Sequence, residues 1–327
     1  MTVPPSPNPD VQSLPPRRLG RAGFEVRPFG LGGGSLGGDR TTDEAAVAAV
    51  RRALELGIDF IDTSAGYGMG ESERRIGLAL TPQDRRRIRL QTKAGSGTRP
   101  KAYDGDSIRR SVEASLKRLR TEYLDVCLIH DPDDMEPVLA SRGGIEALVR
   151  LKEEGVIGAT GLGVRSHDFH RRAIADGRFD VILTYLDYTL LSRTAAPLIA
   201  DAAAAGLGVV IGAPLATGLL GSGEGPPCRY GHPATPDDPD VQTALRLRRW
   251  AADRGVSLPA LALQWILRNP RVGVVIAGAV SAAEVEENVR AVTAPLPLGL
   301  WEEWEKTGLK DEGYGRGEVD GSGGAAE

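Results

Sequence analysis

The sequence predicts a single (β/α)8 TIM barrel, and three observations lead to this prediction. Short apolar runs rich in β-branched residues alternate with helical patterns eight times, which is typical of a parallel sheet covered on both faces. Eight such units within about 290 residues favour a closed barrel over an open doubly wound sheet. Ionisable residues also end three consecutive runs, where barrels of this class hold their active sites.

The elements follow in chain order. Residues 17–27 place Arg21, Ala22 and Gly23 between two short extended pieces, which predicts a β-hairpin that caps the barrel. The connection from Leu215 to Asp240 is rich in Gly, Pro and Asp, so we interpret it as a long functional loop over the barrel mouth. The eight expected strands span residues 28–32, 58–62, 88–93, 124–130, 156–164, 180–186, 208–214 and 272–278.

Both ends of the chain differ in composition from the rest. Residues 1–16 hold six prolines without a basic start or an apolar centre, which indicates a flexible leader and no secretory signal. The stretch 311–327 is rich in Gly and charge and is expected to be disordered. Residues 17–310 are then one barrel domain.

Composition excludes several classes of protein. The 327 residues are 41% hydrophobic and 26% charged, with a net charge of −4, so no basic surface for nucleic acid is expected. No apolar run approaches the roughly 20 residues that span a bilayer. Two cysteines give no disulfide framework, so a cytoplasmic location is the expectation. A monomer or a homodimer is compatible with such a barrel.

Four ionisable residues collect at the expected barrel mouth. Asp62, Lys93 and His130 end the second, third and fourth strands, and Tyr67 follows on the loop after the second. Each has a structural alternative: an aspartate often caps a helix, a strand-end lysine is often solvated, and a lone histidine is often a core residue. Four of them on neighbouring strands favour a functional site.

The four residues make chemical sense together. A tyrosine has an ordinary pKa near about 10, too high for proton transfer at neutral pH unless a cation lowers it. Lys93 can supply that cation, Asp62 can hold the ammonium, and His130 can donate a hydrogen bond to a substrate oxygen. Reversible proton transfer at a carbonyl or alcohol oxygen follows. The four histidines are scattered, so no metal site is expected.

The motifs that surround these residues resemble those of a known superfamily. They are GIDFIDTSAGYGMGESERRIGLAL, QTKAG, YLDVCLIHD, LVRLKEEGVIGATGLGV and VVIAGAVSAAEVEENV, and they resemble the aldo-keto reductases. The resemblance implies Tyr67 as general acid/base, Lys93 as the group that lowers its pKa, Asp62 as the partner of the lysine and His130 as the residue that places the reacting oxygen. It also implies a nicotinamide dinucleotide bound across the barrel mouth without a Rossmann fold.

The same resemblance assigns cofactor contacts, with departures. Arg165 and Ser166 stand where a Ser-Asn pair usually holds the carboxamide, Thr184 where a glutamine is common, and Gly212 where some members stack an aromatic ring. Gly278 and Glu284 replace basic residues that bind the 2′-phosphate of NADP, so NAD is the expected cofactor and NADP the alternative. The further contacts expected are an adenine contact at Asn288, backbone N–H groups of Gly218 and Gly221 near the pyrophosphate, and Pro214 and Leu215.

Further motifs narrow the expected activity. DVILTYLDYTLL, GVVIGAPLATGLL, EGPPCRYGHPATP and ALALQWILRNP resemble the branch of L-galactose and L-fucose dehydrogenases, also called D-threo-aldose 1-dehydrogenases. That branch implies NAD-dependent oxidation of the C1 hemiacetal of a free aldose, such as L-galactose, L-fucose or D-arabinose, to the lactone. One alternative is an NADPH-dependent reductase of aldehydes or ketones. Another is a cofactor-binding regulatory module without turnover. The intact tetrad of Asp62, Tyr67, Lys93 and His130 argues against that alternative.

Overall fold

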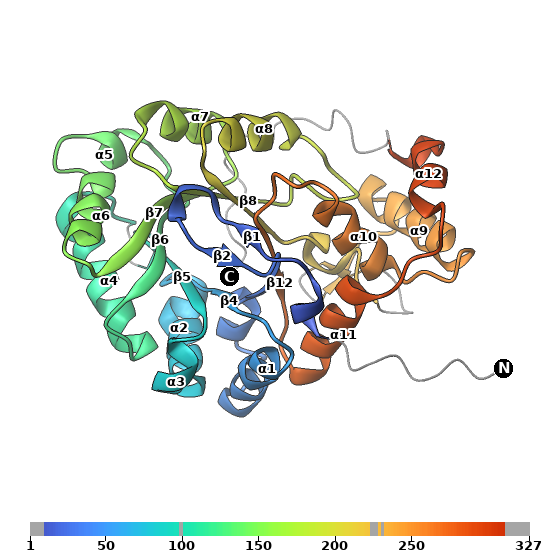
Figure 1. The fold of residues 1–327 in the computed structure, drawn as a ribbon, viewed down its shortest axis with the longest axis horizontal. Coiled ribbons are helices and arrows are strands. Elements are labelled where there is room, and N and C mark those ends of the chain that lie inside the picture. The colour runs from blue at the N-terminus through green and yellow to red at the C-terminus, as the bar shows by residue number, and fades with distance from the viewer. Residues whose placement is uncertain (1–9, 98–100, 223–227, 230–231, 311–327) are drawn as a thin grey trace.

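The computed structural model describes residues 10–97, 101–222, 228–229 and 232–310. Eight parallel strands close into a barrel in the order β12-β3-β4-β5-β6-β7-β8-β9 (Figure 1), as predicted. The strands of the barrel are β3 (Phe29–Gly32), β4 (Phe60–Asp62), β5 (Arg89–Ala94), β6 (Leu124–His130), β7 (Ile157–Gly163), β8 (Val181–Tyr185), β9 (Gly208–Gly212) and β12 (Val274–Gly278).

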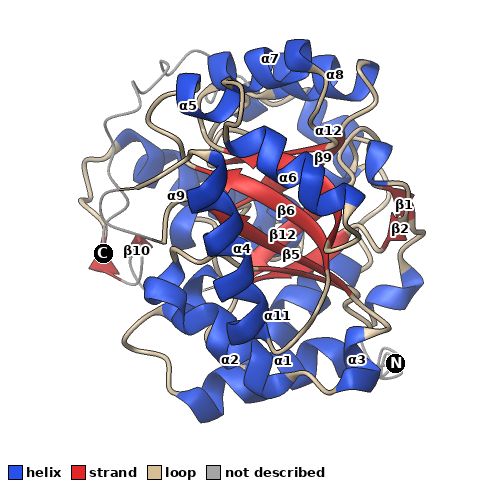
Figure 2. Ribbon diagram, turned by 90° about the vertical axis from the view of Figure 1, so that its left-hand side faces the viewer, coloured by secondary structure: helices blue, strands red, loops and turns tan. Residues whose placement is uncertain are grey.

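Helices surround the strands on the outside (Figure 2). Among them, α1 shows why these segments are helical: Thr42 caps it by accepting a hydrogen bond from Ala45 N–H, and acidic residues occupy its first turn. The α-helices are α1 (Asp43–Glu55), α2 (Glu71–Ala79), α3 (Pro82–Arg85), α4 (Gly105–Leu119), α5 (Glu136–Leu139), α6 (Gly144–Glu153), α7 (His167–Asp176), α8 (Ala196–Ala204), α9 (Pro239–Ala252), α10 (Leu258–Leu267), α11 (Ala282–Thr293) and α12 (Leu300–Glu305).

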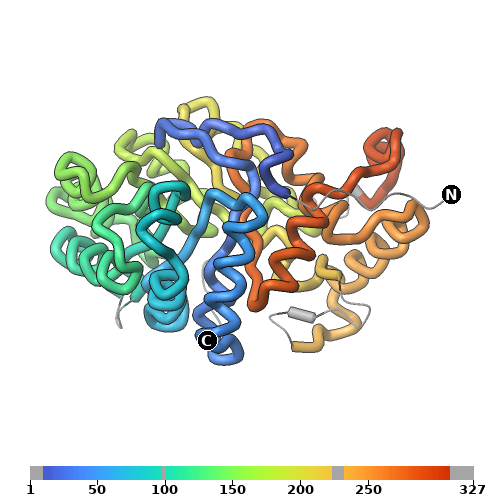
Figure 3. The backbone as a smooth tube through the Cα atoms, turned by 60° about the horizontal axis from the view of Figure 1, so that its bottom comes forward, coloured from blue at the N-terminus to red at the C-terminus, as the bar shows by residue number. Residues whose placement is uncertain are grey.

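Alternation along the strands creates two separate cores. On β6, Cys127 and Ile129 face the helices, while Val126 and Leu128 face the barrel interior. The inner core also takes side chains from the hairpin β1 (Arg17–Arg18) and β2 (Glu25–Val26). This hairpin covers one end of the barrel (Figure 3), so the predicted cap is confirmed and the mouth lies at the other end.

Two segments contain more regular structure than the sequence predicts. Residues 10–16 of the expected leader pack on the barrel, because Val11 is buried and its N–H donates to Leu56 O at 3.0 Å. Within the expected mouth loop, β10 (Cys228–Arg229) pairs with β11 (His232–Pro233). Residues 1–9 and the tail 311–327 lie outside the described residues. No described helix combines the length and the apolar character needed to cross a membrane.

Candidate active site

The barrel brings the four predicted residues to one place. Asp62 is the last residue of β4, Lys93 the last but one of β5 and His130 the last of β6. These three strands are neighbours in the barrel, and the alternation of the strands turns all three side chains inward. Tyr67 begins the short 3-10 helix η4 (Tyr67–Gly70) beyond β4.

Lys93 is the centre of the site. Its ammonium donates to Asp62 Oδ2 at 2.7 Å, to the Thr63 carbonyl at 2.9 Å and to Tyr67 Oη at 2.9 Å. An ammonium has three donors, so all are used inside the protein. The Tyr67 oxygen is therefore an acceptor toward Lys93, and its own proton points elsewhere. Gln91 completes the site by donating to Asp62 Oδ1 at 2.7 Å.

Burial and charge set the protonation of these groups. Burial alone would lower the pKa of Lys93, but the charges of Asp62 and Tyr67 outweigh it and the pKa is raised. Burial raises the pKa of the Tyr67 phenol, while the Lys93 ammonium opposes that rise. Lys93 therefore stays a cation, and its charge offsets part of the rise in the pKa of Tyr67.

The turn after Tyr67 depends on glycine. Gly68 has φ +58°, and a Cβ placed there would lie 2.1 Å from Gly37 O, so no other residue fits. This turn holds the Tyr67 ring over Lys93, with the ammonium 4.5 Å from the ring centroid. The close approach of two backbone segments thus fixes the position of the phenol.

His130 is held by two hydroxyl groups. Its Nδ1 lies 2.7 Å from Ser64 Oγ and 2.6 Å from Ser96 Oγ. Because Nε2 lies 3.4 Å from the carboxylate of Asp131, which is an acceptor only, we assign the ring proton to Nε2 and the acceptor role to Nδ1. Burial, aided by the charge of Lys93, lowers the pKa of His130 well below its usual value. The neutral ring stands edge-on to Tyr67, with centroids 5.5 Å apart.

Glycines end the three barrel strands that follow β4 on the side away from β5. Gly32, Gly212 and Gly278 end β3, β9 and β12, which are adjacent strands, and all three positions face inward. An added Cβ would lie 3.4 Å from its nearest neighbour at Gly32, 3.2 Å at Gly212 and 3.0 Å at Gly278, so side chains at the last two positions would be crowded. This glycine wall begins beside the tetrad, since Gly32 pairs with Asp62 of β4, and its lack of side chains fits the flat nicotinamide ring of a dinucleotide.

The structure places the expected carboxamide contacts unevenly. Arg165 is half-buried at the mouth and makes no hydrogen bond or ion pair within the described chain, so its donors are open to a ligand. Ser166 caps α7 by accepting from Phe169 N–H at 3.3 Å. Thr184 faces the helix layer and donates to Asp187, whereas Tyr185, one residue on, faces inward. Thr184 is expected from the sequence to contact the carboxamide of the cofactor, but in this structure its side chain points away from the mouth.

The remaining expected cofactor residues have tasks within the protein. The N–H groups of Gly218 and Gly221 donate to Leu215 O and Gly218 O, each at 3.0 Å, so in this conformation neither is open to a pyrophosphate. Pro214 is buried. The Glu284 carboxylate accepts from Val280 N–H at 3.0 Å. The amide of Asn288 donates to the Gly278 carbonyl at 3.1 Å and fixes the turn between β12 and α11.

Sequence reasoning missed several groups that support the tetrad. Thr63 and Ser64 follow Asp62 directly, and Asp131 follows His130. Their signal is the run of polar residues immediately after each strand, which marks the barrel mouth. Ser96 and Tyr185 carried a weaker signal of the same kind.

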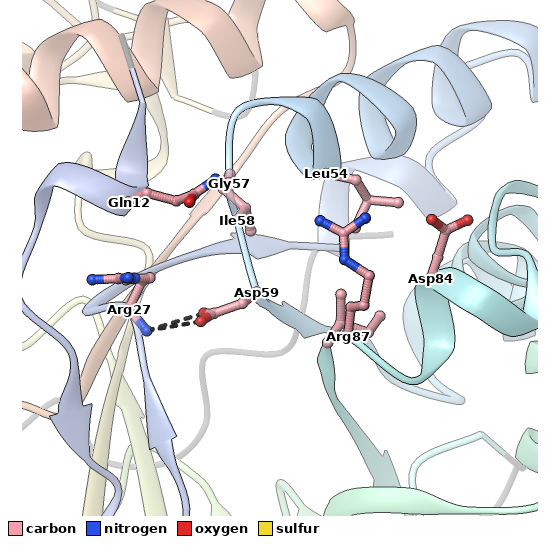
Figure 4. A pocket seen from close by; sticks show the side chains of 9 residues that line it. Gln12, Arg27, Leu54, Gly57, Ile58, Asp59, Asp84 and Arg87 are labelled. Atoms are coloured by element: carbon pink, nitrogen blue, oxygen red, sulfur yellow. Dashed lines mark hydrogen bonds between the residues drawn. The ribbon is translucent and has the colours of Figure 1, made fainter.

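A cavity at the opposite end holds none of these residues. It has a volume of about 190 Å³, and Figure 4 shows Arg27, Asp59, Asp84 and Arg87 around it. The N-terminal end of a barrel ordinarily serves stability. Within the described chain, no group of three or more His, Cys, Asp or Glu side chains could hold a metal ion.

A barrel with this cluster of ionisable residues and this glycine wall fits a nicotinamide-dependent oxidoreductase. The model of the aldo/keto reductase family matches residues 28–308, and the chain belongs to that family. The family uses nicotinamide cofactors and acts on small carbonyl compounds. The superfamily resemblance seen in the motifs is thereby confirmed.

Known relatives point to one branch. The chain is 34% identical to L-galactose dehydrogenase of Arabidopsis thaliana over 296 residues, which are 88% of this chain and 91% of that one. It is 30% identical to D-threo-aldose 1-dehydrogenase of Pseudomonas sp, covering 86% and 94%. Among solved structures, an aldo-keto reductase from Bacillus halodurans in its holo form superposes with a TM-score of 0.72 at 28% identity, covering 88% and 93%.

Proposed function

We propose that the protein is an NAD-dependent aldose 1-dehydrogenase, which oxidises the C1 hemiacetal of a free aldose to the lactone. The observation that carries this proposal is the 2.9 Å contact between Lys93 Nζ and Tyr67 Oη in a site that Asp62 anchors. The names of the two sugar dehydrogenases that the chain resembles supply the substrate class, with L-galactose, L-fucose and D-arabinose as candidates.

Each residue of the site has its own role in the proposed reaction. Tyr67 takes the proton of the anomeric hydroxyl, and Lys93 stabilises the phenolate that does so. His130 donates its Nε2 hydrogen to the same substrate oxygen and orients it. When bound, the cofactor accepts the hydride that leaves C1, so the substrate loses one proton and one hydride and C1 becomes a carbonyl.

The preference for NAD rests on charge. Gly278 and Glu284 stand where basic residues are usual, and the Glu284 carboxylate lies beside the end of β12, where it accepts from Val280 N–H. An anion at that position repels the 2′-phosphate of NADP and can accept a hydrogen bond from a ribose hydroxyl. The prediction of NAD therefore stands as part of the proposal.

The test is NAD(P)H formation with a panel of aldoses. We expect NADH to form with at least one of L-galactose, L-fucose and D-arabinose, and NADP to give a much lower kcat/KM. Oxidation of none of these sugars, together with reduction of simple aldehydes by NADPH, would instead identify a carbonyl reductase. Cofactor binding without turnover of either kind would identify a regulatory module.

A further inference from the structure

A carboxylate next to the tetrad has no part in the proton transfer. Asp131 follows His130 at the end of β6, and its Oδ2 lies 3.4 Å from His130 Nε2. Its Oδ1 accepts a hydrogen bond from Tyr185 Oη at 3.1 Å. The side chain is 30% exposed, so it borders the space in front of the tetrad and is not a core residue.

The backbone holds this carboxylate in a strained conformation. Asp131 has φ +42°, which is uncommon for a residue with a side chain. Three hydrogen bonds fix it: its N–H donates to Gly163 O at 2.8 Å, and its carbonyl accepts from Tyr103 Oη at 2.8 Å and Lys101 Nζ at 3.1 Å. Strain maintained by so many contacts is characteristic of functional positions.

The carboxylate has acceptor capacity left over. An ionised carboxylate offers about four lone-pair sites, and the described residues give it one hydrogen bond and one longer contact to His130. Since His130 Nε2 holds the reacting oxygen, Asp131 Oδ2 lies beside that oxygen. A substituent on the carbon next to the reacting one is a short distance from that oxygen, and we take it as the group that faces Asp131 Oδ2.

We infer that Asp131 selects substrates with a hydroxyl on the carbon adjacent to the reacting carbon, by accepting a hydrogen bond from that hydroxyl. Tyr185 is its positioning residue, because its phenol holds Oδ1 and so directs Oδ2 toward the mouth. The inference rests on the proposed roles of Tyr67 and His130 and deepens them by naming the substrate feature. A plain aldehyde or a 2-deoxy sugar leaves the carboxylate without this partner.

The experiment compares matched substrates that differ in one hydroxyl. D-Arabinose and 2-deoxy-D-ribose form the oxidative pair, and lactaldehyde and propanal form the reductive pair. We expect the hydroxylated member to have a kcat/KM higher by about 10- to 100-fold, as suits a hydrogen bond to a charged group. If no sugar is oxidised, the proposed activity fails, but the reductive pair still tests the role of Asp131.

Variants then assign the preference. Asp131→Ala is expected to lower kcat/KM only for the hydroxylated substrate, so the ratio of the two kcat/KM values should come within about threefold of one. Asp131→Asn keeps the size and a neutral acceptor, so its ratio of kcat/KM values should lie between those of the wild type and Asp131→Ala. Tyr185→Phe should also lower this ratio. Asp134→Asn is the control, because it removes an equal charge from the same loop at an exposed side chain that accepts only from Glu136 N–H within the described residues. A wild-type ratio near one, an unchanged ratio in the Asp131 variants, or an equal loss for both substrates would overturn the inference.

Discussion

The ammonium of Lys93 lies 2.9 Å from the phenolic oxygen of Tyr67, and its two other donors are bound to Asp62 and the Thr63 carbonyl. Because these partners come from β4 and the loop after it, the barrel itself sets the distance between cation and phenol. The geometry holds the cation against the phenol oxygen without any rearrangement of the protein, and there it opposes the rise in pKa that burial imposes on Tyr67.

Replacement of Tyr67 by Phe tests the acid/base role. The variant keeps the ring and loses the hydroxyl, so we expect kcat to fall by about 10²- to 10⁴-fold, the usual contribution of general acid–base catalysis. Binding of NADH, followed by fluorescence titration, should be retained. Tyr123→Phe makes the same change at a residue before β6, at the capped end of the barrel, and should behave as wild type. Full activity in Tyr67→Phe would exclude the proposed mechanism.

Replacement of Lys93 by Met should separate stability from catalysis. Lys93 and Asp62 are both almost fully buried, so loss of the cation leaves an uncompensated carboxylate and costs about 3–5 kcal/mol of unfolding free energy. The double variant Asp62→Asn with Lys93→Met should recover much of this stability in urea denaturation and remain inactive. Arg109→Met is the control, since its pair with Glu154 is exposed and contributes at most about 1 kcal/mol. Recovery of turnover in the double variant would contradict the role of Lys93.

The tautomer of His130 depends on Ser64 and Ser96. Removal of one hydroxyl leaves the other at Nδ1, so Ser64→Ala alone should have a small effect. The double variant with Ser96→Ala leaves a buried Nδ1 without a partner, and we expect kcat to fall about tenfold. Two-dimensional ¹⁵N–¹H spectra of the histidine ring report the tautomer directly. A proton found on Nδ1 in the wild type would refute the assignment.

His170 should make the protein less stable in acid. Burial lowers its pKa from 6.5 to about 4, so the folded state resists a proton that the unfolded state binds. Its contribution is complete above pH 6.5 and is lost as the pH falls toward 4, by about 3 kcal/mol in all. Urea denaturation at several pH values measures this slope. His170→Leu should flatten it, while His232→Gln, at an exposed position, should not.

The charge of Glu284 is expected to discriminate between the two cofactors. Glu284→Gln keeps an acceptor for the Val280 N–H and removes the anion, so NADPH binding should improve relative to NADH by several-fold, about 1 kcal/mol. Titrations at low salt check the ratio of the two dissociation constants. Glu302→Gln, on α12, is the matched control. An unchanged ratio would mean that another group sets the preference.

The sequence by itself determined the barrel and the tetrad. Eight apolar runs of strand length specify a parallel sheet covered on both faces, because only that arrangement buries each run completely. Asp62, Lys93 and His130 could be identified because each lies at or within one residue of the end of such a run, and the carboxyl ends of barrel strands meet at one face. The position of each residue along its strand was therefore enough to identify these three candidates without knowledge of their side-chain contacts.

Only the tertiary structure decided which neighbours complete the site. Sequence spacing cannot show that Thr184 faces the helices while Tyr185 faces the mouth, since a shift of one residue reverses the face of a strand. Nor can it show that the N–H groups of Gly218 and Gly221 are used within their own loop. The contact of Asp131 with His130 and Tyr185 joins β6 to β8, and such contacts arise only once the barrel has closed.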